Sequence, residues 1–391
     1  MRASTYIVVL LVGFGAAASF HADARPSVKI IHVFAGGTDG LYPSGPMTLD
    51  NGILFGTTSA GGNSTCFSGC GTVFEIEPQS GNESVLYSFA GGKDGAGPAQ
   101  AALTVEKNII FGTTPNGGAY GFGTIYRIDI SRGKESVLYS FKGGNDGRSP
   151  QAGVHYLHGV LYGTTANGGN GNCPNNGCGT IFMFDLKTRT ETILHTFSGG
   201  LDGAYPYSGL TYARGLLYGT THSVVPNSCS GVCGNLFTID PNSGAENVVY
   251  TFKGGTDGGE PTLQPIYFAG NLYGVTADGG NDDSGTVFRF DPSTGTETVL
   301  HSLQSQGTNG VSPMGILLFE HGSLFGTTWL GGTDGVGTIF RLNLKNLNAR
   351  QLWSFGTEAA QYPTAGLVSY GQSFYGTTQN PGTAYELSLE H

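Results

Sequence analysis

The chain reads Val248-Val-Tyr-Thr-Phe-Lys-Gly-Gly-Thr-Asp-Gly-Gly-Glu-Pro261, then Gly270-Asn-Leu-Tyr-Gly-Val-Thr276, then Gly285-Thr-Val-Phe-Arg-Phe-Asp291. These segments are the clearest copy of a pattern that occurs seven times between about Val28 and the end of the chain. The glycine of its Gly-Thr-Thr element recurs at Gly56, Gly112, Gly163, Gly219, Gly274, Gly326 and Gly376. The copies therefore repeat every 50 to 56 residues, a period typical of four-stranded propeller blades.

The composition fits strands separated by turns. Glycine accounts for 67 of the 391 residues and charged residues for only 12%. The glycines stand at fixed offsets beside aromatic and β-branched residues, so they mark the ends of strands. No helical periodicity of useful length follows the first 25 residues. The formal net charge of −10, without a cluster of Lys or Arg, argues against nucleic acid or an anionic membrane as a partner.

Each repeat offers four short strand-like segments. In the second repeat these are residues 101–105, 108–114, 123–129 and 135–141. Alternation places Tyr126 and Ile128 on one face of their strand and predicts that Val137, Tyr139 and Phe141 share a face of theirs. A single four-stranded sheet cannot bury its faces alone, so neighbouring repeats must pack face to face.

The two ends of the chain predict a closed ring. The seventh repeat supplies three strands, near 366–370, 373–378 and 383–389, and lacks the outer one. Val28-Lys-Ile-Ile-His-Val-Phe34 matches the outer-strand pattern but precedes the first complete repeat. Pairing this segment with the last repeat hides two sheet edges. We therefore expect an all-β fold, a seven-bladed β-propeller closed by an N-terminal outer strand on the last blade.

The first 24 residues read as a signal peptide. Arg2 supplies a positive end, an apolar run follows from Tyr6 to Ala18, and Ala22-Asp23-Ala24 resembles a cleavage site. The run is too short for a comfortable membrane span. We expect a secreted protein, extracellular or periplasmic, whose residues 25–391 form one propeller domain. An uncleaved anchor is the alternative.

The tandem Leu-Tyr-Gly-Thr-Thr, Gly-Gly and Gly-Thr-Val-Phe pattern resembles the GloVer repeats of exported bacterial proteins known as choice-of-anchor tandem repeat proteins. The resemblance covers essentially the whole chain after the signal peptide. It implies a repeat architecture and no particular activity, because the family is defined by its repeats. No anchoring segment follows Glu390-His391, which departs from the family's habit, so the sequence leaves open the surface anchoring that the resemblance implies.

Two connections in each repeat are long, and in an up-and-down blade both lie on one face of the disc. One of them carries an acidic residue followed by glycine, at Asp39, Asp94, Asp146, Asp202 and Asp257. Calcium loops need several oxygen ligands at short spacing. A single Asp before Gly is what a turn needs, because its side chain accepts backbone N–H groups. We therefore assign these residues a structural role and expect no metal site.

The cysteines form three close pairs in the loops after Gly-Thr-Thr, namely Cys66/Cys70, Cys173/Cys178 and Cys229/Cys233. The loops with cysteines are longer than their counterparts, so each pair can close the extra residues as a local disulfide in an exported protein. Metal ligation is the weaker interpretation, since the spacings are not Cys-x-x-Cys and no histidine stands beside them.

Aromatic residues in the long loops are the best candidates for binding. Tyrosine precedes the loop proline at Tyr42, Tyr205 and Tyr362, and Tyr120 and Trp329 stand in the loops after Gly-Thr-Thr. Flat rings on a weakly charged rim suit sugar rings or a partner protein. The loop of the seventh repeat is the shortest, so we expect the lowest wall near Tyr362 and Tyr42, with Trp329 beside it. Ordinary packing between loops is the alternative for each ring.

Catalytic signals are weak. Gly-Thr-Thr is followed by neither lysine nor a helix, which excludes a phosphate cradle, and no motif calls for a cofactor. The entries to the innermost strands are small or polar and predict a hydrated channel; they are Gln100, Gln151, Ser208, Gln264 and Thr364. An enzyme would need a close carboxylate pair or a cluster of His, Tyr and Arg on the loop face. The acids and the base there are Glu260, Asp282, Asp283, Asp334 and Arg148, which no spacing links.

Two functions remain open. The favoured one is a non-catalytic, monomeric binding protein that recognises a glycan or an extracellular protein. The alternative is an extracellular hydrolase or lyase acting on polysaccharide, which rests on analogy with other propellers alone.

Overall fold

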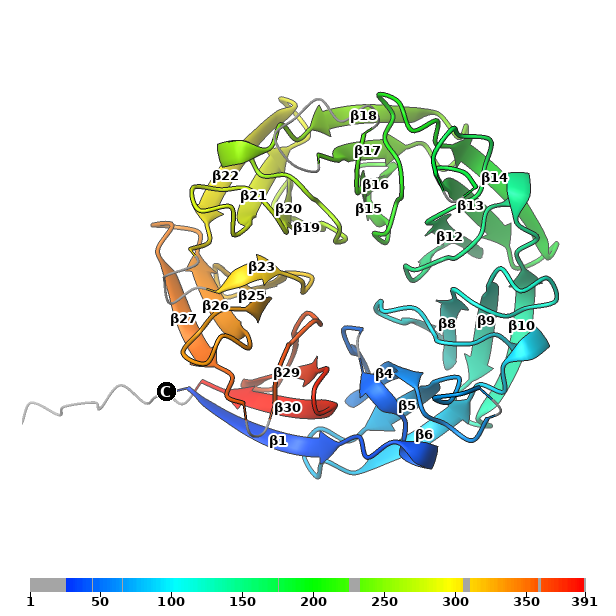
Figure 1. The fold of residues 1–391 in the computed structure, drawn as a ribbon, viewed down its shortest axis with the longest axis horizontal. Helices are drawn as coiled ribbons and strands as arrows, with labels where there is room; N and C mark the ends of the chain where they lie inside the picture. Colours follow the sequence, from blue (N-terminus) through cyan, green and yellow to red (C-terminus); the bar gives the residue numbers. More distant parts are fainter. Residues whose placement is uncertain are drawn as a thin grey trace, which may run out of the picture.

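The structure is a closed ring of seven β-sheets (Figure 1). It is a computed structural model that describes residues 26–43, 45–64, 66–174, 176–224, 233–304, 310–357 and 360–389. The expected signal peptide lies outside the described residues. We number the blades in chain order after the N-terminal strand. The seven-bladed propeller expected from the repeats is confirmed.

Each blade is an antiparallel sheet whose strands run in order from the channel to the rim. Blades 1 to 3 contain β3 (Thr48–Asp50), β4 (Ile53–Ala60), β5 (Thr72–Ile76), β6 (Glu83–Ser88); β7 (Thr104–Glu106), β8 (Ile109–Thr114), β9 (Thr124–Asp129), β10 (Lys134–Ser140); and β11 (His155–Leu157), β12 (Val160–Thr165), β13 (Thr180–Asp185), β14 (Thr190–Thr196). Blades 4 and 5 contain β15 (Thr211–Ala213), β16 (Leu216–Thr221), β17 (Asn235–Ile239), β18 (Glu246–Thr251); and β19 (Ile266–Phe268), β20 (Asn271–Thr276), β21 (Thr286–Asp291), β22 (Thr296–Ser302). Blades 6 and 7 contain β24 (Leu318–Glu320), β25 (Ser323–Leu330), β26 (Thr338–Asn343), β27 (Ala349–Ser354); and β28 (Val368–Tyr370), β29 (Ser373–Thr378), β30 (Thr383–Ser388).

The outer strand of blade 7 is β1 (Ser27–Val33), which pairs antiparallel with β30 from Ser27↔Ser388 to Val33↔Thr383. Figure 1 shows β1 and β30 side by side at the lower edge of the ring. Phe34 continues the contact, because its amide donates to the Gly382 carbonyl and its buried ring packs on Phe74 of blade 1. The closure expected from the chain ends is confirmed.

Each residue of Gly-Thr-Thr has a distinct structural role. The glycine lies opposite an aromatic ring of the third strand, as in Gly274↔Phe288, where an added Cβ would lie 2.5 Å from the ring. The first threonine links blades, as when the Thr113 hydroxyl donates to the Ala152 carbonyl of blade 3 at 2.7 Å. The second threonine bonds the first residue of the third strand, as in Thr114–Thr124 at 2.8 Å. The expectation that this element belongs to the sheet is confirmed.

A β-bulge interrupts the outer pairing of every blade. The residue left without a cross-strand partner is aliphatic in all seven, namely Ile31, Leu86, Leu138, Leu194, Val249, Leu300 and Leu352. A bulge increases local twist, and here it corrects one expectation. Val137 pairs with Tyr126 and Tyr139 with Ile125, which are neighbours on opposite faces of β9. Val137 and Tyr139 therefore do not share a face.

The innermost strands are shorter than expected. In blade 2 the strand begins at Thr104, three residues after the expected start at Ala101, and the preceding segment runs along the channel. Blades 1 and 6 also contain short strands that the sequence did not indicate, β2 (Leu41–Pro43) and β23 (Val311–Pro313). They pair with the C-terminal ends of β4 and β25.

We predict that Phe34→Ala lowers the free energy of unfolding by about 3–5 kcal/mol, because it removes a buried ring at the junction where the ring closes. The neighbouring Val33 is 52% exposed, so Val33→Ala should change stability by no more than about 0.5 kcal/mol. Denaturant unfolding checks both variants. Equal stabilities of the two variants would contradict the idea that the closure stabilises the propeller. Deleting residues 26–34 should, in addition, promote association between molecules through the exposed edge of β30.

Candidate functional site

Both long connections of each blade lie on one face of the disc, because they pair with each other. Examples are the bridges Ala96↔Asn116, Arg148↔Asn167 and Ala204↔Ser223. We call this side the loop face and the opposite side, where two-residue turns join the inner strands, the tight-turn face.

The repeated aspartates are tied into their own loops. One carboxylate oxygen accepts a backbone N–H four residues earlier, as from Ala90 to Asp94 at 2.6 Å and from Lys253 to Asp257 at 2.8 Å. The other oxygen accepts a side-chain donor of the outer strand, as from the Tyr87 hydroxyl to Asp94 at 2.9 Å or from His32 to Asp39 at 3.0 Å. The structural role expected for these acids is confirmed.

A glutamate of the next outer strand faces each of these aspartates, which the sequence analysis missed. Burial and then the charge of Asp94 raise the pKa of Glu135 to about 8, and burial and Asp146 do the same for Glu191. Burial raises the pKa of Glu83 and of Glu297 to about 7, with Asp39 and Asp257 as the next causes. One carboxyl oxygen of each glutamate is buried without a hydrogen-bond partner in the described structure. A neutral carboxyl group is therefore favoured at neutral pH for Glu135 and Glu191.

One of these groups has the composition of a metal site. The ligand atoms of His32, Asp39 and Glu83 lie within 4.8 Å of one another. In three other blades a tyrosine takes the place of the histidine and donates to the same aspartate, as Tyr87, Tyr139 and Tyr250 do. The repetition with a residue that is a poor metal ligand indicates that this group holds the loop.

Two of the expected disulfides are present, Cys66–Cys70 and Cys173–Cys178, with Cα atoms 5.3 Å and 5.1 Å apart. Cys233 is also disulfide-bonded, and its expected partner Cys229 lies outside the described residues. Disulfides favour an oxidising compartment.

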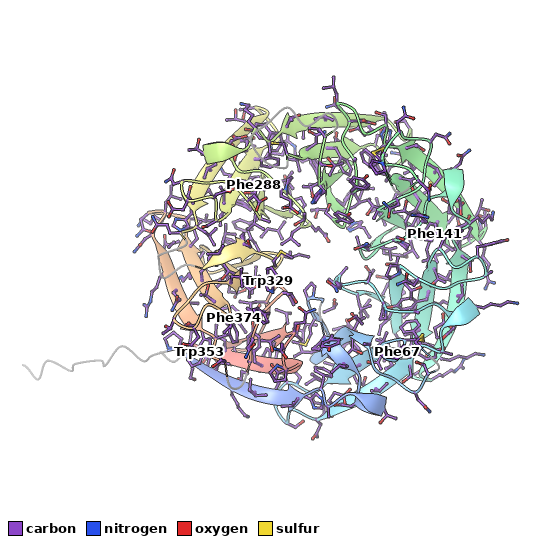
Figure 2. The ribbon with its side chains drawn as sticks, in the orientation of Figure 1. Phe67, Phe141, Phe288, Trp329, Trp353 and Phe374 are labelled. Carbon is purple, nitrogen blue, oxygen red and sulfur yellow. A yellow bond between two sulfur atoms is a disulfide. The ribbon has the colours of Figure 1, made fainter. Side chains whose placement is uncertain are left out.

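Exposed aromatic side chains occur in the loops of the loop face and also on two innermost strands, at Tyr212, Tyr267 and Phe268. Tyr42, Tyr120 and Trp329 are 43%, 56% and 41% exposed. Trp329 contacts Tyr362 of the next blade, with ring centroids 6.0 Å apart, and Figure 2 shows Trp329 on the inner side of blade 6. Phe67 is fully exposed and was missed by the sequence analysis, although a ring between two cysteines four positions apart is a recognisable signal.

The five expected aromatic residues are therefore not equivalent. Trp329 and Tyr362 are brought together, and Tyr42 follows on blade 1 with no ring contact among the described residues. Tyr205 is engaged in packing, because its ring stacks on Tyr207 and its hydroxyl donates to the Pro174 carbonyl at 3.1 Å.

The backbone of these tyrosines is strained. Tyr42, Tyr205 and Tyr362 have φ values of 59°, 57° and 59°, in the left-handed region that favours glycine. Blade 2 uses Gly97 at this position, with φ of 60°. The proline that follows packs on a glycine of the preceding blade, as Pro363 does on Gly337. The fold therefore sets the backbone conformation at this position but does not require a tyrosine side chain there.

An ionisable cluster that no spacing indicated lies between blades 4 and 5. His222 Nε2 lies 2.7 Å from Glu260 Oε1, and this hydrogen bond lowers the pKa of Glu260. Burial, followed by the charge of Glu260, raises the pKa of Asp278. The rings of Tyr207 and His222 pack edge to face, with ring centroids 5.4 Å apart. His222 and Glu260 are 38 residues apart in the chain, and only the packing of adjacent blades joins them.

The central channel contains a cavity of about 40 Å3, lined among others by Gln100, Ser208, Gln264 and Thr364. Four of the five polar residues expected there are thus at the channel. The cavity is large enough for water and too small for a sugar ring.

These features define a closed seven-bladed β-propeller whose loop face carries exposed aromatic rings. The sequence matches the model of the Gloeobacter/Verrucomicrobia repeat over residues 12–233 and 222–388. The chain therefore belongs to that repeat family, as its motifs indicated.

Solved structures share the architecture at low identity. An oligogalacturonate lyase from Vibrio parahaemolyticus is 9% identical with a TM-score of 0.58, and the match covers 95% of each chain. The computationally designed Ika8 protein is 14% identical with a TM-score of 0.53, and the match covers 91% of this chain and 99% of the other. Such likeness shows the fold alone. The sequence matches none of the curated proteins with which it was compared.

Within the described residues, no helix has the length and apolar character needed to cross a membrane.

The glutamates with raised pKa values predict a pH dependence of stability. The folded-state pKa of these two glutamates lies above the ordinary value of 4.5. The stability that they contribute to the folded protein is therefore fully present below pH 4.5 and is lost as the pH rises toward 8. Glu135→Gln and Glu191→Gln should each raise the free energy of unfolding at pH 8 by about 1–2 kcal/mol, a figure reduced for partial exposure, and change it little at pH 5. Urea unfolding at both pH values measures this.

The exposed Asp282 gives the matched control, because Asp282→Asn should have the same small effect at both pH values. If the glutamine variants gain no stability at pH 8 relative to pH 5, the glutamates are charged in the folded protein.

Proposed function

We propose that this protein is a non-catalytic binding propeller that acts outside the cytoplasm and recognises a glycan or an exported protein through its loop face. The observation that carries the proposal is the exposure of Tyr42, Phe67, Tyr120 and Trp329 on that face, whereas the phenylalanines of the repeat motif, such as Phe141 and Phe288, are buried within the ring (Figure 2).

The chemistry of these residues supports recognition of flat, weakly charged surfaces. Tyrosine and tryptophan offer a large apolar area with few rotatable bonds and a polar edge. Tyr42 and Tyr362 stand where the backbone favours glycine, and a residue held in such a conformation costs on the order of 1 kcal/mol or more. Retaining the ring there is consistent with a use for the side chain.

The hydrogen bonds and the disulfide of the described loops support a preformed binding surface. The Asp-Gly loops are fixed by the aspartate hydrogen bonds, and Phe67 is carried by the loop that Cys66–Cys70 closes. A preformed site loses less conformational entropy on binding than a mobile one.

The wider setting belongs to the same proposal. Residues 1–24 act as a signal peptide, 25–391 form one domain, and the protein works as a secreted monomer without a cofactor. The disulfides and the N-terminal sequence pattern support export.

One observation favours a second candidate, an enzyme that acts on polysaccharide. The His222–Glu260 pair with Tyr207 beside it is the kind of cluster that general acid–base chemistry requires. His222 Nδ1 is buried, and no described residue holds the imidazole at this second nitrogen as catalytic histidines often require. This favours binding over catalysis.

The binding proposal predicts the effect of removing single rings. In a glycan array and a pull-down of exported proteins with the purified domain, Trp329→Ala and Phe67→Ala should each weaken binding about 2- to 12-fold. The melting temperature should change by less than about 2 °C, because these rings are exposed. Tyr267→Ala, which removes a ring of similar exposure on the tight-turn face, is the control and should bind normally. Unchanged affinity in both loop-face variants would refute the proposal.

The second candidate has its own test. We expect no turnover when the protein is incubated with neutral and uronate-containing polysaccharides and followed by reducing-sugar release and ultraviolet absorbance. Turnover that disappears in His222→Gln and Tyr207→Phe would replace the binding proposal with the enzymatic one.

A further inference from the structure

A pocket of about 410 Å3 opens on the tight-turn face between blades 6 and 7. It lies at the turns that join β24 to β25 and β28 to β29. Its lining includes the aromatic Phe325 and Phe374 and the polar Glu320, Arg341, Ser369 and Ser373. Figure 2 labels Phe374 where blade 7 faces blade 6.

The pocket exists because one residue departs from the repeat. The middle residue of the innermost strand is apolar or aromatic in six blades, where it is Leu49, Val105, Tyr156, Tyr212, Tyr267 and Phe319. In blade 7 the same register position is Ser369, opposite Phe374.

The large residues at this position cover the preceding blade. Phe319 stacks on Phe268 at 3.5 Å, and Tyr156 stacks on Phe111 at 6.3 Å. Ser369 supplies no ring at this position. Phe374, which stands where the other blades have Leu or Ile, contacts Phe325 with ring centroids 4.7 Å apart. Both rings are buried and form the apolar base of the pocket.

The charge beside these rings fits a small anion. Arg341 lies over the Phe325 ring at 5.8 Å, and its Nε donates to the Ser323 hydroxyl at 2.9 Å. No carboxylate of the described residues lies within ion-pair distance of Arg341. The guanidinium therefore has its terminal nitrogens available, in the geometry that binds a carboxylate in two places.

Glu320 of blade 6 and Ser369 of blade 7 offer partners for hydroxyl groups. Glu320 accepts a hydrogen bond from the Ser369 hydroxyl at 3.3 Å, and its other oxygen lies 3.3 Å from His321 Nδ1. A carboxylate and a serine hydroxyl are suited to binding sugar hydroxyl groups.

We propose that this pocket binds a sugar acid, with the carboxylate on Arg341 and hydroxyl groups on Glu320 and Ser369. The volume is that of a small-molecule site. This inference does not depend on the proposed function, because the pocket lies on the face opposite the exposed loop aromatics.

The probe is glucuronate, titrated into the wild-type domain by calorimetry and ligand-observed NMR. Glucose lacks the carboxylate and acetate lacks the ring, so each should bind at least about tenfold more weakly. Equal binding of glucuronate and glucose, or no binding of glucuronate, would overturn the proposal.

Two variants locate the site. Arg341→Gln should weaken glucuronate binding by about ten- to a hundredfold. Arg289→Gln is the matched control, because Arg289 occupies the same register position in blade 5, and it should leave the affinity unchanged. If both variants or neither lose affinity, glucuronate does not bind at this pocket.

The double variant Ser369→Tyr/Phe374→Leu restores the residues of blades 3, 4 and 5 and should close the pocket. We expect it to abolish binding while keeping the melting temperature at or above that of the wild type, which excludes misfolding as the cause. Binding that persists in a folded double variant would place the sugar acid elsewhere.

Discussion

The contact between the second-strand glycine and the third-strand aromatic ring is the constraint on which the propeller depends. At Gly274 the Phe288 ring occupies the space that a side chain would need, so the ring lies flat against its own sheet. The sheet then presents a smooth apolar face that the next blade can cover, and the flanking threonines hydrogen-bond within the blade and to its neighbour. One small residue in each repeat thus sets the distance at which neighbouring blades of the propeller pack.

A second constraint operates at the rim. The bulge at Leu138 turns Tyr139 toward Asp146, and the aspartate in turn fixes the loop that faces Glu191 of the next blade. The bulge at Leu138, the conformation of the Asp146 loop and the raised pKa of Glu191 are therefore linked through these contacts. The described part of the Asp146 loop is therefore held by hydrogen bonds that begin in the sheet.

The sequence was sufficient for features that repeat. The strand order, the place of Val28–Phe34 in blade 7, the role of Asp94 in its turn and the pairing of Cys66 with Cys70 all followed from local pattern and spacing. It was insufficient where contacts join different blades at one place only. His222 and Glu260 meet through packing, and the pocket beside Arg341 exists because Ser369 is small. A missing side chain becomes visible only when the register between strands is known.

The pairing of Ser27 with Ser388 has a consequence for the order in which the molecule forms. Among the strands of the ring, β1 comes first along the chain and its partner β30 comes last. During synthesis β1 therefore stays unpaired until all seven blades have been made, and its edge and the unfinished blade 7 are exposed to wrong pairings for that time. Closure of the propeller is thus the final step of its folding and depends on every blade that lies between these two strands.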